Sequence, residues 1–251
     1  MTPVLSDSGL VFGRCLRQTL RSRIGLLFAL IQPLLFLSFF GPLLREVPLG
    51  GRGDSWGTLV PGLLIQLGLF SSAFAGFGIV MEKQTGVVER MRVTPVSRTA
   101  LLLGRVLRDV VVLVAQSTVL VLAGVAFGLR APVLGVLIGF VFVATLAVAL
   151  ASLSYAFAMR VNSPQEFAPV INSVNLPLML LSGILLPMAL APGWLDALSR
   201  LIPLRYLVEA VRAAFVGDYG SAAIAEGALA AALLAVCSAA LGIRLFRRAG
   251  A

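Results

Sequence analysis

The sequence predicts an all-α polytopic membrane protein with six transmembrane helices, an amino-terminal amphipathic helix and a short outer amphipathic helix before the last span. The first observation is compositional: 59% of the 251 residues are hydrophobic and 12% are charged, against about 45–50% and about 25% in soluble domains. The second is a series of apolar stretches long enough to cross a bilayer. Disordered chains combine low hydrophobicity with high charge, so the composition also excludes disorder. We expect one transmembrane domain over residues 1–251.

Six stretches meet the length that a membrane imposes. A helix rises about 1.5 Å per residue, so about 20 apolar residues cross about 30 Å of hydrocarbon. Arg130 and the two residues after it are all that separates the third and fourth apolar stretches, which predicts a tight helical hairpin. We expect spans at about residues 24–44, 58–81, 107–129, 131–159, 167–192 and 227–244.

The distribution of basic residues orients these spans. With the amino terminus inside, 14 of the 20 Lys and Arg residues fall in inner segments and 6 in outer segments. Positively charged loops stay on the cytoplasmic side, so both termini are expected to face the cytoplasm. Cytoplasmic loops and anionic headgroups then account for the net charge of +9, and no nucleic acid is expected as a partner.

Residues 9–23 form the first amphipathic segment. An apolar residue recurs every four positions on one side, while arginines line the other side. Such a helix lies flat at the inner headgroup boundary with its arginines toward lipid phosphate. The alternative is an ordinary positive flank of the first span. The two sides consist of Phe12, Leu16 and Leu20 and of Arg14, Arg17 and Arg21.

The second amphipathic segment, residues 203–215, falls outside by the same count of charges. Its apolar residues share one face, and Arg205, Glu209 and Arg212 share the opposite one. Arg205 and Glu209 are spaced to pair at i, i+4, and Glu209 and Arg212 at i, i+3. Three charges cannot face lipid unshielded, so we expect a helix at the outer interface or one that dips into the protein.

Several catalytic chemistries are excluded by residue counts. The chain has no His, and its two cysteines, Cys15 and Cys237, form no Cys-x-x-Cys motif, so no metal site or catalytic residue is expected. Its one lysine, Lys83, lies between Glu82 and Gln84. A phosphate-binding P-loop needs Gly-x-x-x-x-Gly-Lys-Ser/Thr, so this chain is not expected to hydrolyse ATP or to hold a cofactor.

The segment of residues 82–98, between the second and third spans, mixes both signs of charge and is long beside the other connections. From the residues alone it is either a solvated loop or a charged knuckle that docks a soluble partner. With Gly104 and Arg105, this segment resembles the permease subunit of ABC-2 type exporters, in the branch of daunorubicin-resistance-type drug exporters. The matching residues are Glu82, Gly86, Glu89, Arg90, Thr94, Pro95, Val96, Ser97 and Arg98.

A second match, near the carboxyl end, supports the resemblance, which covers nearly the whole chain. It consists of Pro203, Leu204, Tyr206 and Arg212. The resemblance implies a multi-pass protein of the bacterial cell (inner) membrane that joins a second permease copy or a sister permease. It also implies an ABC ATP-binding subunit as partner, with ATP and Mg bound in that subunit. Its contacts would use Glu82, Gly86, Glu89, Arg90, Thr94, Pro95 and Arg98, with Gly86 and Pro95 fixing turns.

The expected function is outward transport of an amphiphilic drug or lipid, because charge-free spans offer apolar walls and few polar groups. Polysaccharide export, an ion-coupled carrier and a membrane-embedded enzyme remain alternatives. The apolar runs hold no Asp, Glu, Lys or Arg, and Asp109 lies at the cytoplasmic start of the third span, which weakens proton coupling. Asn172 and Asn175 in the fifth span line a substrate path or dimer seam, or act as interhelical hydrogen-bonding residues.

Overall fold

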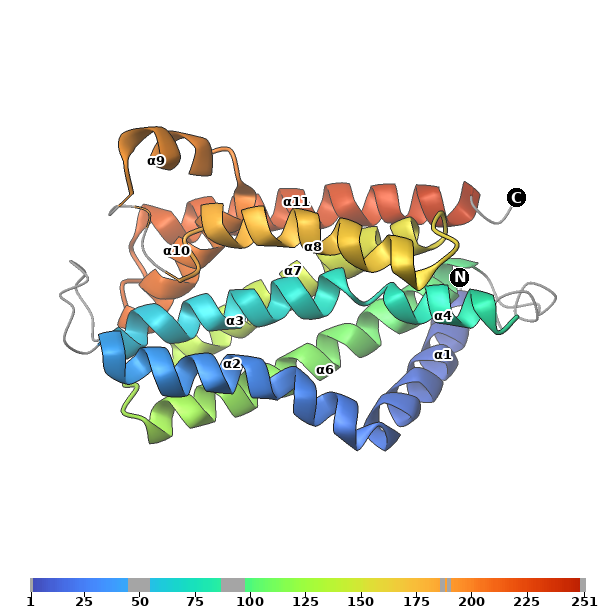
Figure 1. Cartoon of the computed structure of the whole chain (residues 1–251), viewed down its shortest axis with the longest axis horizontal. Coiled ribbons are helices and arrows are strands. Elements are labelled where there is room, and N and C mark those ends of the chain that lie inside the picture. The colour runs from blue at the N-terminus through green and yellow to red at the C-terminus, as the bar shows by residue number, and fades with distance from the viewer. Residues whose placement is uncertain (1, 45–54, 87–97, 186–187, 189–190, 249–251) are drawn as a thin grey trace.

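The structure, a computed structural model, describes residues 2–44, 55–86, 98–185, 188 and 191–248, and within these it is all-helical. Long helices run side by side as one bundle (Figure 1). Two of these helices, α3 and α4, follow one another in the same direction along the bundle. The bundle helices are α2 (Arg23–Leu44), α3 (Ser55–Ala73), α4 (Phe77–Gln84), α6 (Arg98–Ala126), α7 (Val133–Ala158), α8 (Pro164–Leu181) and α11 (Ala222–Arg248).

The two ends of the bundle differ. Both chain termini lie at one end, with the end of α4 and the start of α6; we call this the termini end (Figure 1). The short helices α9 (Gly193–Ser199) and α10 (Pro203–Val216) lie at the opposite end, the α10 end. The shared end agrees with the expectation that both termini lie on one side of the membrane. That this side is the cytoplasm remains a prediction.

Helix length and composition show a multi-pass membrane protein. Among the described residues, four segments are long and apolar enough to cross a bilayer, and a shorter apolar helix, Leu30–Pro42, lies within α2. The predicted fifth span, 167–192, differs most from the structure, because α8 ends at Leu181 and Gly183 turns the chain with a φ of +73°. The count of six spans therefore remains a prediction. The four segments are Trp56–Gln84, Thr99–Ala126, Val133–Ala158 and Ala222–Gly242.

The predicted hairpin between the third and fourth spans is confirmed. Helix α6 ends at Ala126 and α7 begins at Val133. Gly128 adopts a φ of +113°, a backbone conformation that side chains with a Cβ rarely allow. The N–H of Leu129 closes the turn by donating to the carbonyl of Gly124 at 2.9 Å. Pro132 is the residue just before α7, and its extended backbone, with a ψ of 142°, leads the chain into that helix.

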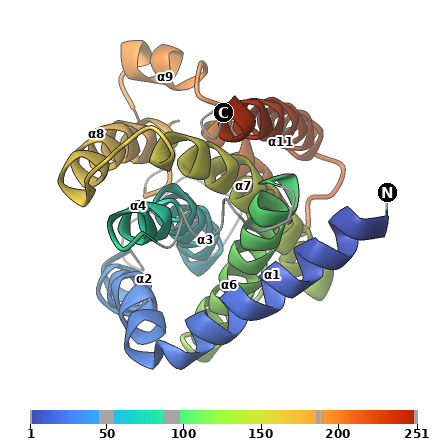
Figure 2. The same ribbon diagram turned by 90° about the vertical axis from the view of Figure 1, so that its right-hand side faces the viewer.

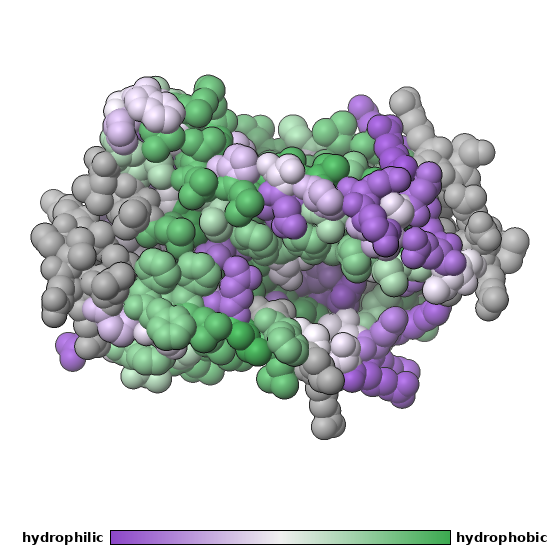
Figure 3. All heavy atoms as spheres, viewed as in Figure 1, coloured by the Kyte–Doolittle hydropathy of each residue, from purple (hydrophilic) through white to green (hydrophobic). Residues whose placement is uncertain are grey.

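Helix α3 lies at the centre of the bundle and α11 at its edge. In the apolar window of Trp56–Gln84, 67% of residues are buried, against 17% in that of α11. Helix α11 exposes Leu229, Leu233 and Val236, which recur at helical spacing and thus face outward together. Figure 3 shows the same distribution, with hydrophobic atoms along the middle of the visible face and hydrophilic ones gathered toward the termini end. Lipid tails solvate such apolar surface as well as protein does.

Helix α1 (Thr2–Arg21) crosses the bundle instead of running along it (Figures 1 and 2), as an interfacial helix should. It packs on α6, where a Cβ at Gly104 would lie 2.8 Å from both the Ser8 carbonyl oxygen and the Val11 Cβ. The packed side thus includes Ser8 and Val11, while Leu20, expected on the apolar side, is 58% exposed. The predicted helix is present, but the face that packs on α6 includes Ser8 and Val11 and differs from the apolar face expected from the sequence.

Candidate functional site

The predicted coupling segment, residues 82–98, connects the end of α4 to the start of α6 at the termini end of the bundle. Helix α4 ends at Gln84, and Gly86 adopts a φ of +71° while its N–H donates to the Lys83 carbonyl at 3.1 Å. A left-handed glycine just past a helix is a common terminator, because it has no Cβ to clash. Gly86 therefore fixes a turn at the position where the sequence predicts one.

Glu82 faces the bundle. Its Oε2 accepts from Nη2 of Arg105 at 2.5 Å, and the side chain of Arg105 is 9% exposed and that of Glu82 27%. The ion pair therefore joins α4 to α6 where the predicted coupling segment begins. The neighbouring Lys83 donates from Nζ to the carbonyls of Met159, at 3.1 Å, and Val161, at 2.7 Å. Because these carbonyls follow the carboxyl end of α7, the lysine also meets the negative end of that helix dipole.

The remaining residues of the predicted partner interface are only partly placed. Glu89, Arg90, Thr94 and Pro95 fall in residues 87–97, outside the described residues. Arg98 is the first residue of α6, so its backbone lies at the same end as Glu82 and Gly86. The structure thus places both anchors of the segment, and the assignment of its contacts to an ATPase remains a prediction.

A buried polar cluster beside this segment was not predicted from the sequence. Arg108 donates to the hydroxyls of Thr19 and Tyr155, each at 3.2 Å, and its Nε lies 3.1 Å from Oδ1 of Asp109. The Tyr155 hydroxyl donates to Oδ2 of Asp109. The cluster links α1, α6 and α7. Asp109 is therefore buried between helices, with its side chain 12% exposed, and its position at the cytoplasmic start of the third span remains a prediction.

The sequence carried one signal for this cluster. Arg108 and Asp109 precede an apolar run, and Tyr155 lies inside the next predicted span. A tyrosine hydroxyl in an apolar helix needs a hydrogen-bonding partner, but the sequence does not say which helix provides it.

At the α10 end, glycines of the surrounding helices allow α10 to sink into the bundle. A Cβ at Gly135 of α7 would lie 2.0 Å from the Ala214 carbonyl, and one at Gly227 of α11 would lie 2.3 Å from the Ala210 Cβ. Leu204, a residue of the carboxyl-end motif, is 2% exposed. The amphipathic segment of residues 203–215 therefore dips into the protein, one of the two placements expected for it.

Arg212 fastens this buried helix to two others. Its Nη2 donates to the carbonyls of Gly183, at 2.9 Å, and Ile184, at 3.1 Å, and its Nε to that of Thr58 at 3.2 Å. The first two carbonyls lie just beyond α8, and Thr58 lies in the first turn of α3. The expected i, i+3 pairing of Arg212 with Glu209 is absent among the described contacts. Backbone carbonyls take its place because α10 turns this arginine into the protein.

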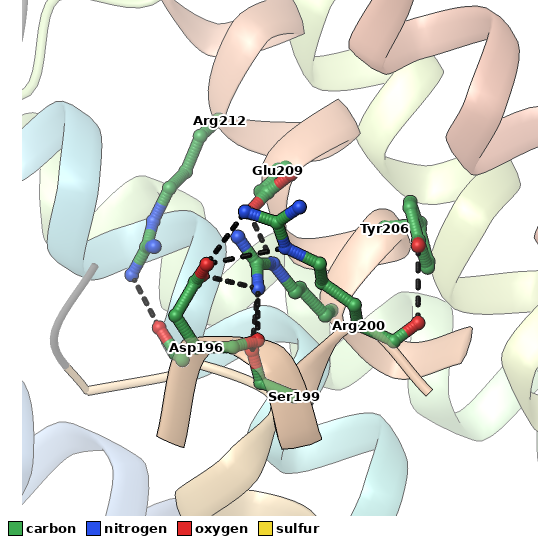
Figure 4. A network of polar contacts seen from close by, with 8 residues as sticks. Asp196, Ser199, Arg200, Tyr206, Glu209 and Arg212 are labelled. Carbon is green, nitrogen blue, oxygen red and sulfur yellow. Dashed lines mark hydrogen bonds and ion pairs between the residues drawn. The ribbon is translucent and has the colours of Figure 1, made fainter. Parts of the chain in front are cut away.

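The charges on the outer side of α10 bind α9 instead. Asp196 of α9 meets Arg200 at 2.7 Å and Arg205 at 2.6 Å, and Arg205 donates to Glu209 at 2.8 Å. The predicted i, i+4 pair of Arg205 and Glu209 is thus confirmed. Hydrogen bonds from Arg200, and then from Arg205, lower the pKa of Asp196 below its usual value. Figure 4 shows this network.

The other motif residues in this region have defined structural roles. Pro203 occupies the first turn of α10, where its missing N–H costs no helical bond. The Tyr206 hydroxyl donates to the carbonyl of Arg200 at 3.0 Å, which holds the chain between α9 and α10 (Figure 4). All four residues of the carboxyl-end motif therefore position α10.

Asn172 and Asn175 are not equivalent on α8. Asn172 is exposed, whereas Asn175 is 3% exposed and its Nδ2 lacks a hydrogen-bond partner among the described residues. An exposed asparagine on a membrane helix suits a polar path or a seam between subunits. Both roles remain predictions.

Comparison with known proteins gives the same family as these motifs. The model of the ABC-2 type transporter family matches residues 9–216. The transport permease ycf38 of Cyanophora paradoxa is 28% identical over 200 residues, which cover 78% of this chain and 69% of that protein. The ycf38 of Porphyra purpurea is 27% identical over 205 residues, which cover 79% and 70%. The daunorubicin resistance ABC transporter permease protein DrrB1 of Streptomyces coeruleorubidus is 24% identical over 223 residues, which cover 88% and 79%. This chain belongs to the ABC-2 type transporter family.

Proposed function

We propose that the chain is the membrane-spanning permease subunit of an ATP-driven exporter, which moves an amphiphilic drug or lipid outward with energy from a separate ATPase subunit. The observation that carries the proposal is the arrangement of the termini end in a member of this family. There α4 and α6 flank the charged segment of residues 82–98, and the Glu82–Arg105 ion pair joins the two helices. A force applied to the segment therefore reaches two bundle helices at once.

The bonds around this segment support a rigid-body mechanism. Lys83 binds the carbonyls beyond α7, and Arg108 binds α1 and α7. Helices α1, α4, α6 and α7 are thus connected by polar bonds at the termini end. Closure of the ATPase subunits would tilt these helices together and open a path toward the α10 end, by the kind of packed-element shift that transporters and switches use.

The surface of the bundle supports an amphiphilic cargo. Its exposed side chains are predominantly apolar along the middle of the face in Figure 3. A cargo that partitions into lipid can approach such a surface laterally, whereas a sugar polymer needs a lining of polar groups. The name of DrrB1, a daunorubicin resistance permease, supports a drug. We place the protein in the bacterial inner membrane with both termini in the cytoplasm, joined to a second permease copy or a sister permease.

The experiment that tests the proposal is co-expression and co-purification with an ABC-type P-loop ATPase of the same organism, followed by reconstitution in liposomes. We expect cargo-stimulated ATP hydrolysis in the complex and no transport by the chain alone. Reversing both charges of the predicted interface (Glu89→Lys with Arg90→Glu) should abolish co-purification. Arg130→Glu, an exposed reversal in the hairpin at the α10 end, is the matched control and should leave the complex intact.

Two results would contradict the proposal. Full coupled ATPase activity with both charges reversed would show that the interface is elsewhere. Transport by the solitary chain along an ion gradient would replace the ATP-driven exporter with an ion-coupled carrier. The buried Asp109 makes the second measurement necessary, because an interior carboxylate is the kind of group that proton coupling uses.

A further inference from the structure

A half-enclosed cavity of about 350 Å³ lies at the termini end, between α1, α2, α4 and α6. Its wall includes Thr19, Ser22, Glu82, Arg105, Arg108 and Gln116. Figure 3 shows hydrophilic atoms at the bottom of a hollow on this side of the bundle. A cavity of about 300–1,000 Å³ is the size that holds a small ligand.

The wall of this cavity is rich in hydrogen-bond donors. Arg105 is 7% exposed and gives one terminal nitrogen, Nη2, to Glu82, while a guanidinium carries five N–H groups. Gln116, which is 5% exposed, adds one acceptor, because its Oε1 has no hydrogen-bond partner among the described residues. The wall holds two arginines and one carboxylate. Glu82 pairs with Arg105, and Asp109, just outside the wall, pairs with Arg108, so these charged groups balance one another.

A polar cavity among apolar helices does not stay empty. Buried polar groups without partners are costly, so water or a polar ligand must fill the space. The N–H groups that Arg105 does not give to Glu82 favour a ligand rich in hydrogen-bond acceptors. Because the planar fork of a guanidinium matches phosphate geometry, a phosphate ester is the chemical class that Arg105 would hold best.

The surroundings of the cavity point to a lipid as the source of that phosphate. Helix α1, which forms one wall, crosses the bundle at the termini end and carries arginines on its exposed side. Helix α2 continues from Gly25, a wall residue, with Leu27 63%, Phe28 68% and Ile31 43% exposed. A lipid with its phosphate in the cavity could therefore lay its acyl chains along α2.

We propose that this cavity binds the phosphate group of a membrane phospholipid, held by Arg105, with the acyl chains against the exposed face of α2. The site lies within one chain and needs neither a partner subunit nor ATP. A test of this site is therefore independent of the proposed exporter function.

The test is a thermal-shift titration of the full chain in detergent with dioctanoyl phosphatidylglycerol. Dioctanoylglycerol, which lacks the phosphate, and glycerol phosphate, which lacks the chains, are the other two probes. We expect a saturable rise in melting temperature with the phospholipid, at least ten times weaker responses to the other two, and at least a tenfold loss of apparent affinity in Arg105→Gln.

A second variant keeps the test informative if Arg105→Gln fails to fold. Gly78 of α4 lines the cavity, and a Cβ there would meet nothing within 4 Å, so Gly78→Leu fills the space without removing a polar contact. It should lose the response, whereas Gly57→Leu, at an equally open glycine of α3, should keep it. An unchanged titration in Gly78→Leu, or an equal response to dioctanoylglycerol, would overturn the site. An equal response to glycerol phosphate would overturn the lipid and leave a soluble phosphate ester as its ligand.

Discussion

Replacing Gly62 with alanine tests the close packing that positions α10. A Cβ at Gly62 would lie 2.0 Å from the carbonyl oxygen of Ile184, whereas ordinary contacts begin at 3.4 Å. The α3 backbone and the turn after α8 would therefore have to separate by about 1.4 Å. Because the same carbonyl accepts from Arg212 at 3.1 Å, the separation also weakens that bond.

The expected cost follows from two opposing effects. Overpacking a close contact costs about 1–3 kcal/mol, and weakening a hydrogen bond to a charged group costs up to about 1.5–3 kcal/mol more. Alanine regains about 1 kcal/mol over glycine in a helix interior. With the bond fully lost, we expect a net loss of about 1.5–5 kcal/mol, or roughly 3–20 °C in apparent melting temperature for a chain of this size.

Differential scanning fluorimetry in detergent measures this shift, and the same helix provides the control. Gly57 of α3 has open space where a Cβ would be added. Gly57→Ala should therefore melt at or slightly above the wild-type temperature. Equal melting temperatures for Gly62→Ala and Gly57→Ala would refute the close approach of α3 to Ile184, and with it the anchoring of Arg212.

Three further predictions concern single contacts. Arg212→Lys should lower the apparent melting temperature by the equivalent of about 1–3 kcal/mol, because a single nitrogen would replace the two, Nε and Nη2, that now bond the two segments; wild-type melting would contradict this. Asp196 has a lowered pKa in the folded chain, so its stabilising effect is complete above its unfolded value of about 3.9 and is lost as the pH falls below about 4. Limited proteolysis of α9 should increase in that range in wild type, with no such step in Asp196→Asn. Gly104→Val should push α1 from α6, since a Cβ there is already 2.8 Å from α1; in a Cys237→Ser background, Cys15 should then react faster with maleimide, and an unchanged rate would count against the contact.

Much of the architecture could be predicted from local patterns. The apolar stretch of residues 24–44 matches α2 within one residue, and that of 131–159 matches α7 within two. Gly86 turns the chain where the motif requires a turn. These features depend on neighbours in the sequence, so a single chain segment contains the information for them.

The candidate site was less predictable, because its contacts join distant segments. Glu82 pairs with Arg105, 23 positions along the chain, which the sequence did not indicate; its contact with a partner protein remains a prediction. Gly135 and Gly139 of α7 both lie against α10, and nothing in the sequence distinguishes them from the other glycines. Arg212 meets carbonyls of residues 58, 183 and 184, which no helical spacing could associate with it.

The sequence by itself determined that the chain enters a membrane, where its long helices fall and which family its motifs resemble. The tertiary structure alone decided which side of each helix faces protein, that α10 is buried and that Asp109 is an interior group. The physical reason is that lipid tails are as apolar as a helix surface, so hydrophobicity distinguishes membrane from water but not lipid from protein. Close-fitting glycines and hydrogen bonds between distant residues make that second distinction, and they exist only once the helices are packed.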